Sequence, residues 1–151
     1  MIRPDHGSLP YFEGEALIVT VTAAASFDGF LYVDLFDAQG NVIHLFPTAA
    51  RNENRVLAGE ELTIGTTRER ARPGERYYEV EAPFGRNMMV AVSSVRPLFN
   101  TVRPEVEPAT SYLADLQQRL RDSQAAMSGS EVMTSYEVIV TSARDAKEGI
   151  R

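Results

Sequence analysis

His44 and His6 are the only histidines among the 151 residues, and the chain contains no cysteine. This composition excludes disulfides, thiolate nucleophiles, iron–sulfur ligation and cysteine-based zinc sites. His44 is the one histidine inside an expected strand, where it could pair with Asp34 across a hairpin and with a nearby serine to imitate a catalytic triad. We favour a cross-strand polar contact on the more exposed face of the hairpin, because such pairs are the usual unit of sheet stability.

Other residues capable of chemistry lack the spacing that chemistry needs. Glu60 and Glu61 are adjacent, so their side chains point apart on an extended chain and cannot face each other across a cleft. The turn at 37–41 has too few oxygen ligands for a calcium loop. No glycine-rich phosphate-binding pattern occurs. We therefore expect no catalytic residues, no cofactor and no metal, and we expect that the protein is not an enzyme.

A binding surface is expected on the rim beside the hairpin. Phe46, Pro47, Asn52 and Asn54 lie where a rigid hairpin carries a long polar loop. Loops held by rigid strands are common places for recognition. The alternative is a well-ordered turn in which the asparagine amides satisfy backbone groups.

Two other groups of residues could bind partners. The segment 68–72 with nearby Arg76 could contact an acidic partner, although a solvated charged loop is the simpler interpretation. An aromatic platform for sugars or peptides is a further possibility, although aromatic residues in a small sandwich usually belong to the core. Its members would be Tyr11, Phe12, Phe46, Phe84 and Phe99.

The charge and apolar pattern limit the partners of the chain. The net charge of −6 and the pI of about 5.0 disfavour general binding to nucleic acid, because an acidic surface repels phosphates. No stretch approaches the roughly 20 apolar residues that span a bilayer, so we expect no membrane insertion by this segment. Residues 1–12 also lack the basic and apolar regions of a signal peptide.

The elements that must position these residues are mostly strands. Apolar and polar residues alternate with a period of two, and glycine- or proline-containing turns separate the alternating runs. The turn at 37–41 joins two such runs into the hairpin that carries Asp34 and His44. The expected strands span residues 17–22, 30–36, 42–46, 76–81, 88–94 and 136–141, and residues 57–64 are expected to form a turn that leads into a further short strand.

A helix is expected late in the chain. Leu113, Leu116 and Leu120 follow helical spacing, which predicts an amphipathic helix over 111–126. Three prolines mark 95–110 as a connector. We expect one domain over 1–151 with its core at 12–142 and flexible tails at 1–10 and 143–151.

This pattern predicts a mainly β fold. We expect an Ig-like β-sandwich of about seven strands with one C-terminal amphipathic helix and a final strand. An SH3-like or other small barrel is the alternative.

Several runs resemble the bacterial domain of unknown function 4384 family. They are Gly29 to Pro47, Asn52 and Asn54, Leu57 to Glu60, Ala82 to Gly85, and Val90 to Ser94. The resemblance covers roughly residues 12–98. It implies an accessory module attached to bacterial serine/threonine kinases, caspase-like peptidases or envelope proteins, and it assigns no catalytic residues.

We therefore expect a noncatalytic domain that recognises a ligand or partner for a larger bacterial signalling or cell-envelope protein. Its partner would be a protein or an envelope component, and the periplasm or envelope is favoured over the cytoplasm. One alternative is a structural or assembly subunit, a possible homodimer, whose final strand and helix dock against a second copy. Another is an envelope carbohydrate-binding module.

Overall fold

The computed structural model describes residues 1–126 and 132–144 and contains ten strands and one helix within them. The elements are β1 (Ile2–Pro4), β2 (Tyr11–Phe12), β3 (Val19–Thr22), β4 (Gly29–Phe36), β5 (Asn41–Phe46), β6 (Arg55–Val56), β7 (Glu61–Ile64), β8 (Gly85–Ser94), β9 (Val106–Pro108), α1 (Ala109–Ala126) and β10 (Val132–Ser142).

The strands form two separate sheets. The small sheet has the order β1-β3-β7, and all its pairs are antiparallel. The large sheet has the order β2-β10-β8-β4-β5-β9, and the short strand β6 pairs with the start of β4. The pairing of β2 with β10 is parallel. The expectation of a mainly β fold with stacked sheets is confirmed, and the alternative of a small barrel is wrong.

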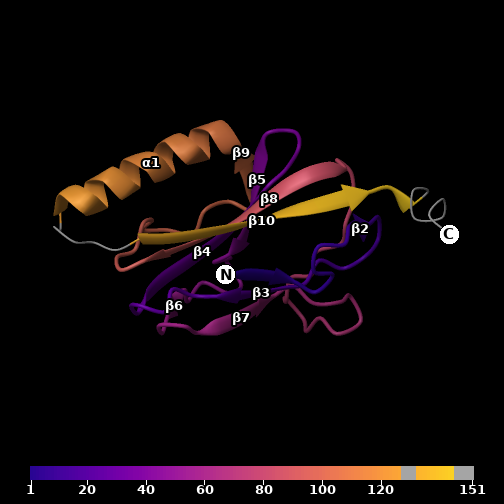
Figure 1. Ribbon diagram of the computed structural model, residues 1–151, viewed down its shortest axis with the longest axis horizontal. Helices are drawn as coiled ribbons and strands as arrows, with labels where there is room; N and C mark the ends of the chain where they lie inside the picture. The colour runs from indigo at the N-terminus through magenta and orange to yellow at the C-terminus, as the bar shows by residue number, and fades with distance from the viewer. Residues whose placement is uncertain (127–131, 145–151) are drawn as a thin grey trace.

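The main core lies between the two sheets. Period-two alternation turns Val19 and Val21 of the small sheet toward the large one, and Leu31, Val33 and Met89 face them from β4 and β8. All five side chains are almost fully buried. Figure 1 shows the small sheet beneath the large sheet and α1 above it.

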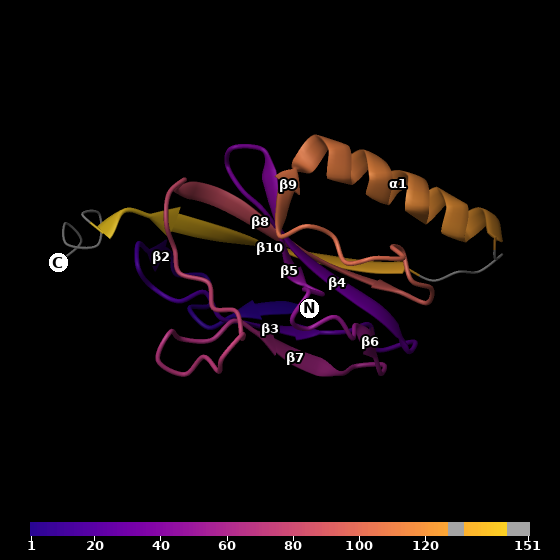
Figure 2. The same ribbon diagram turned by 180° about the vertical axis from the view of Figure 1, so that it is seen from behind.

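Helix α1 covers part of the other face of the large sheet (Figures 1 and 2). Tyr112 is 1% exposed, and Leu116 and Leu120 pack against a second cluster that contains Tyr32. The prediction that Leu113 lies on the inner face is wrong, because this side chain is 47% exposed. Residues one position apart differ by about 100° around a helix, so burying Tyr112 turns Leu113 aside.

The long strands and the helix agree with the sequence pattern, whereas the short strands were not expected. The short strand predicted after a turn within 57–64 is present as β7, whereas the strand predicted at 76–81 makes only the bridge between Glu79 and Ala16. Four unexpected elements, β1, β2, β6 and β9, contain two or three residues each. A strand of two or three residues is too short to show the alternation of apolar and polar side chains by which strands are recognised in a sequence.

Part of the expected N-terminal tail at 1–10 and the expected connector at 95–110 both belong to the folded unit. Strand β1 pairs with β3 and its Ile2 is 5% exposed, so the expected N-terminal tail is wrong there. The connector at 95–110 buries Leu98 to 3% exposure and contains β9, which pairs with β5. Most of the expected C-terminal tail, residues 145–151, lies outside the described residues.

Candidate functional site

The hairpin of β4 and β5 brings Asp34 and His44 together on the face covered by α1. The register shifts between Val33, which pairs with Phe46, and Asp34, which pairs with His44. This irregularity places one extra residue, Leu45, in β5 and puts the histidine on the same face as the aspartate. The distance from His44 Nδ1 to Asp34 Oδ1 is 2.7 Å.

Residues far along the chain complete a buried polar cluster around His44. His44 Nε2 lies 2.6 Å from Glu107 Oε2 in β9, and the Tyr112 hydroxyl of α1 donates a hydrogen bond of 2.5 Å to Asp34 Oδ2. The histidine is 5% exposed and Asp34 is 2% exposed. The predicted contact of His44 with Asp34 is present, but the expectation that it lies on the more exposed face is wrong.

Arg103 forms the outer layer of this cluster. Its guanidinium binds both carboxylate oxygens of Glu107, at 2.9 and 2.7 Å, and donates to Asp115 in the second turn of α1. It also stacks over the rings of Phe99 and Tyr112, at 4.9 and 5.4 Å from their centroids. This planar group therefore joins the connector, β9 and the helix in one charged network.

The hydrogen-bond partners of His44 stabilise its protonated form. Carboxylate oxygens only accept hydrogen bonds, so a ring with a carboxylate on each nitrogen donates from both and is an imidazolium. Burial is the largest single influence and lowers the pKa of His44, but the hydrogen bonds and charges of Asp34 and Glu107 together outweigh it and raise the pKa. The hydrogen bond from Arg103 lowers the pKa of Glu107 despite its burial.

There is almost no space for a substrate beside this cluster. A cavity of about 10 Å³ touches Asp34, His44, Pro47 and Tyr112, which is the volume of a single water position. A serine is absent from its lining, and both nitrogens of His44 are already engaged. Among the described residues, no group of three or more His, Asp or Glu is placed to hold a metal ion. The arrangement can hold β5, β9 and α1 together.

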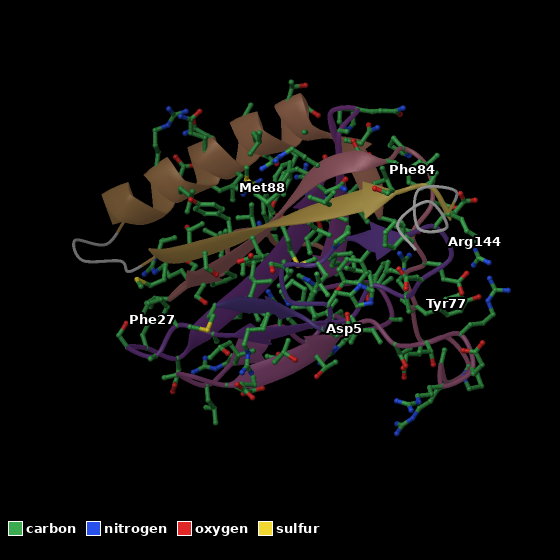
Figure 3. The ribbon with its side chains drawn as sticks, turned by 45° about the vertical axis from the view of Figure 1, so that its right-hand side comes forward. Asp5, Phe27, Tyr77, Phe84, Met88 and Arg144 are labelled. Atoms are coloured by element: carbon green, nitrogen blue, oxygen red, sulfur yellow. The ribbon has the colours of Figure 1, made fainter. Side chains whose placement is uncertain are left out.

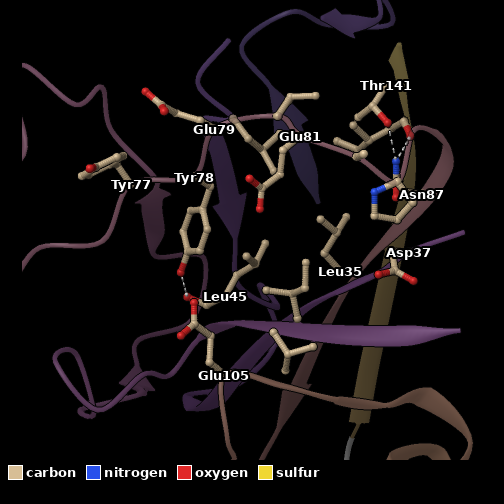
Figure 4. Close-up of a pocket in the computed structure, with 17 residues that line it drawn as sticks. Leu35, Asp37, Leu45, Tyr77, Tyr78, Glu79, Glu81, Asn87, Glu105 and Thr141 are labelled. Carbon is tan, nitrogen blue, oxygen red and sulfur yellow. Dashed lines mark hydrogen bonds between the residues drawn. The ribbon is translucent and has the colours of Figure 1, made fainter. Parts of the chain in front are cut away.

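A much larger cavity opens at the end of the sandwich, away from α1. Its volume is about 390 Å³, and its floor is apolar, formed by Leu35, Ile43 and Leu45 from the hairpin and by Val80 and Ile139. Figure 4 shows these walls with Tyr78 on one side, whose hydroxyl donates to the carbonyl of Leu45 at 3.4 Å. The β4–β5 hairpin, the segment around Val80 and strand β10 therefore build it together.

The rim of this end cavity carries four carboxylates, of which two are neutralised. Glu79 is paired with Arg68 and Glu105 with Arg76, whereas Asp37 accepts backbone hydrogen bonds within its own turn. Glu81 has no ion pair among the described residues. Its carboxylate points toward the cavity in Figure 4, whereas that of Glu79 points away. The cavity thus combines an apolar floor with net negative charge.

The four residues predicted for binding do not share one open surface. Phe46 is 1% exposed and packs in the main core, with the Arg51 guanidinium 5.0 Å from its ring centroid. The amide of Asn54 donates to the carbonyl of Leu31, so it satisfies a backbone group. Pro47 borders the small cavity at His44, and Asn52 is exposed.

The other candidate groups are also dispersed. Tyr11 is buried, and Phe84 and Phe99 pack against the two core clusters, so the aromatic residues do not form one exposed platform. Two arginines of the basic region, Arg68 and Arg76, are engaged by the rim carboxylates of the end cavity.

Sequence reasoning missed Arg103, Glu107 and the polar role of Tyr112. Arg103 and Glu107 lie in the segment 95–110, for which the three prolines predict a connector, and helical spacing alone gives Tyr112 no polar role. A carboxylate that is buried on a hairpin needs a cation or a hydrogen-bond donor to offset the cost of removing its charge from water. The need for such partners near Asp34 is the signal that could have pointed to Arg103 and Tyr112.

Comparison with known proteins identifies the family. The family model described as domain of unknown function (DUF4384) matches residues 10–97. The chain belongs to this family. The DUF4384 match runs from just before β2 to just after β8 and includes Asp34 and His44, whereas Glu107, Tyr112, α1 and β10 lie beyond it. No curated protein and no solved structure matches the chain.

Proposed function

We propose that this chain is a noncatalytic recognition domain of a larger bacterial signalling or cell-envelope protein. In this proposal the end cavity binds a short partner segment that places an apolar side chain beside a cationic one. The observation that supports this proposal most is the cavity of about 390 Å³, which has an apolar floor and, at its rim, the carboxylate of Glu81, which has no ion pair among the described residues. Pockets of this size are typical of ligand sites.

The charge of the chain supports a cationic partner. The net charge of −6 attracts positive groups and speeds their encounter with an acidic rim. An apolar side chain would contact the floor near Leu35 and Ile43, while its cationic neighbour would reach Glu81 and Asp37. The hydrophobic contact would supply affinity and the charges would supply selectivity.

The absence of catalysis is part of the proposal. His44 is the histidine that the DUF4384 region could offer as a base, and its two ring nitrogens are held by carboxylates. A cavity of about 10 Å³ beside it does not admit a substrate.

Within the described residues, no helix combines the length and apolar character needed to cross a bilayer.

The test is the affinity of two short probe peptides, a Leu-Arg repeat and a Leu-Glu repeat, measured by isothermal titration calorimetry. We expect the Leu-Arg peptide to bind and the Leu-Glu peptide to bind much more weakly. Glu81→Lys should weaken Leu-Arg binding roughly tenfold or more at low salt. Glu53→Lys makes the same charge change on an exposed loop away from the cavity and should have a smaller effect. Equal binding of both peptides, or no binding of either, would contradict the proposal.

A further inference from the structure

Strand β10 is long and lies near an edge of the large sheet. It pairs with β8 from Val132 to Thr141, but on its other side β2 pairs only with Thr141 and Ser142. Among the described strands, none pairs with that side of β10 between Val132 and Val140. This free edge extends over about 27 Å, at about 3.4 Å for each residue step.

The residues whose backbone groups point out of the sheet edge can be identified. The carbonyl of Ser142 accepts a hydrogen bond of 2.9 Å from the amide of Glu13, so it points to the β2 side. Backbone direction alternates along a strand. The amides and carbonyls of Thr134, Tyr136, Val138 and Val140 therefore point to the same side and offer a row of unpaired donors and acceptors.

Three side chains along this edge are apolar and exposed to solvent. Tyr136 is 68% exposed, Val138 is 38% exposed and Val140 is 37% exposed, on the face of the sheet that carries α1. Met88 of β8, which pairs with Val138, adds a fourth apolar side chain to this face (Figure 3). Soluble proteins usually protect edges with lysine, proline or bulges. From Val132 to Val140 the edge contains no basic residue and no proline, and Glu137 is its sole charge.

We propose that a second copy of this chain pairs with this edge, strand β10 against strand β10 in antiparallel orientation, about a two-fold axis at Tyr136. Tyr136 then faces its own counterpart, Thr134 faces Val138, and Val132 faces Val140. Since all these residues have outward-facing backbone groups, up to about ten interchain hydrogen bonds can form. The proposal concerns the free edge of the large sheet, whereas Ile139 and Thr141 of the same strand line the end cavity, and it goes beyond the proposed function.

The residues of the edge favour a second copy of the chain as the partner and an axis at Tyr136 as the register. The free edge from Val132 to Val140 is centred on Tyr136, so this axis uses its whole length. Glu137 then faces Ser135 of the other copy, whereas an axis at Glu137 would oppose two like charges directly. Aromatic and β-branched pairs are favourable across antiparallel strands. The edge is therefore complementary to itself, as a two-fold interface must be.

The inner face of the helix does not offer the same opportunity. Leu116 and Leu120 already pack against the second core cluster of their own chain. A dimer that buries these leucines between copies would require α1 to leave the sheet and would break the contacts of Tyr112 with Asp34. The free edge requires no such change.

Sedimentation velocity of the full chain tests the dimer. We expect a monomer–dimer equilibrium whose Kd rises about tenfold or more in Val138→Lys, because each substitution occurs twice in a symmetric interface. Leu57→Lys makes the same kind of change at a side chain that is 63% exposed and distant from β10, so its Kd should match the wild type. Circular dichroism checks that both variants fold.

Cysteine crosslinking tests the register, because the natural chain has no cysteine. Under mild oxidation, Tyr136→Cys should form a disulfide-linked dimer, whereas Val140→Cys alone should not, since its two copies would lie about 27 Å apart. A mixture of Val132→Cys and Val140→Cys chains should crosslink to each other. A chain that remains monomeric, a dimer unaffected by Val138→Lys, or a Tyr136→Cys variant that does not crosslink would overturn the proposal.

Discussion

His44 acts as a buried cation that holds two carboxylates, one from each side. Asp34 lies 2.7 Å from one ring nitrogen and Glu107 lies 2.6 Å from the other. Asp34 belongs to the matched DUF4384 region, whereas Glu107 belongs to β9 beyond it. The histidine therefore links the family region to the rest of the chain. Removing His44 leaves two buried carboxylates without the cation that they share. The resulting loss of folding stability exceeds the net stabilisation that the two ion pairs provide.

The first prediction concerns the pH dependence of unfolding. Folding raises the pKa of His44, so its stabilising contribution is complete below the unfolded value of about 6.5 and is lost as the pH rises through the higher folded value. Folding lowers the pKa of Glu107, so its contribution is present above its ordinary value of about 4.5 and is lost in acid.

Urea unfolding of the wild type should therefore show stability that declines as the pH rises from about 6.5. His44→Gln should lower the free energy of unfolding by about 3 kcal/mol at neutral pH and abolish the decline above that pH. His6→Gln removes the other histidine, which stacks on Tyr11 outside this cluster, and should preserve the decline. A His44→Gln variant with an unchanged pH profile would refute the assigned role.

At the scale of elements, the large sheet is covered by two unlike layers. The small sheet buries one face through the main core, and α1 covers part of the other through Tyr112, Leu116 and Leu120. The helix begins directly after β9, whose Glu107 is fixed to His44. The charged cluster thus sets the position from which the helix crosses the sheet.

The second prediction separates two leucines of this helix. Leu116 packs against the second core cluster, whereas Leu113 is 47% exposed. Leu116→Ala should lower the free energy of unfolding by about 2 kcal/mol or more through lost burial and the cavity left behind. Leu113→Ala should change it by less than about 0.5 kcal/mol. Chemical denaturation measures both, and equal losses would show that the helix packs with a different face.

Sequence periodicity was sufficient for some elements and not for others. The eight-residue strand β4 and the helix show clear periods, so their existence could be predicted. The partners of His44 could not, because Glu107 lies 63 positions away and Tyr112 reaches Asp34 across 78 positions. The end cavity was also not predicted, since its walls come from turns and strands that only tertiary packing brings together.

At the scale of the whole molecule, the region matched by the family is not a complete packing unit. Residues 10–97 lack β1, β9, α1 and β10. Strand β8 would lose its longest partner, and His44 would lose Glu107 and the cover of Tyr112. The apolar face that α1 covers would be open to water.

The third prediction follows from this incompleteness. A fragment of residues 10–97 should lack the cooperative thermal transition of the full chain, because an exposed sheet face and new sheet edges favour aggregation over folding. Circular dichroism melting of both proteins at equal concentration is the measurement. A fragment that melts cooperatively near the temperature of the full chain would show that β10 and α1 are accessory to the fold.

The central claim is that the end cavity recognises a partner while the cluster around His44 is structural. It is tested most directly by titrating the ¹⁵N-labelled full chain with the Leu-Arg repeat peptide and following the backbone amide signals. The account predicts shifts concentrated at Leu35, Asp37 and residues 77–82 and 105–106, which line the cavity, with little change at Arg103 and Tyr112 of the His44 cluster. Shifts centred on the His44 cluster, or no shifts at saturating peptide, would contradict it.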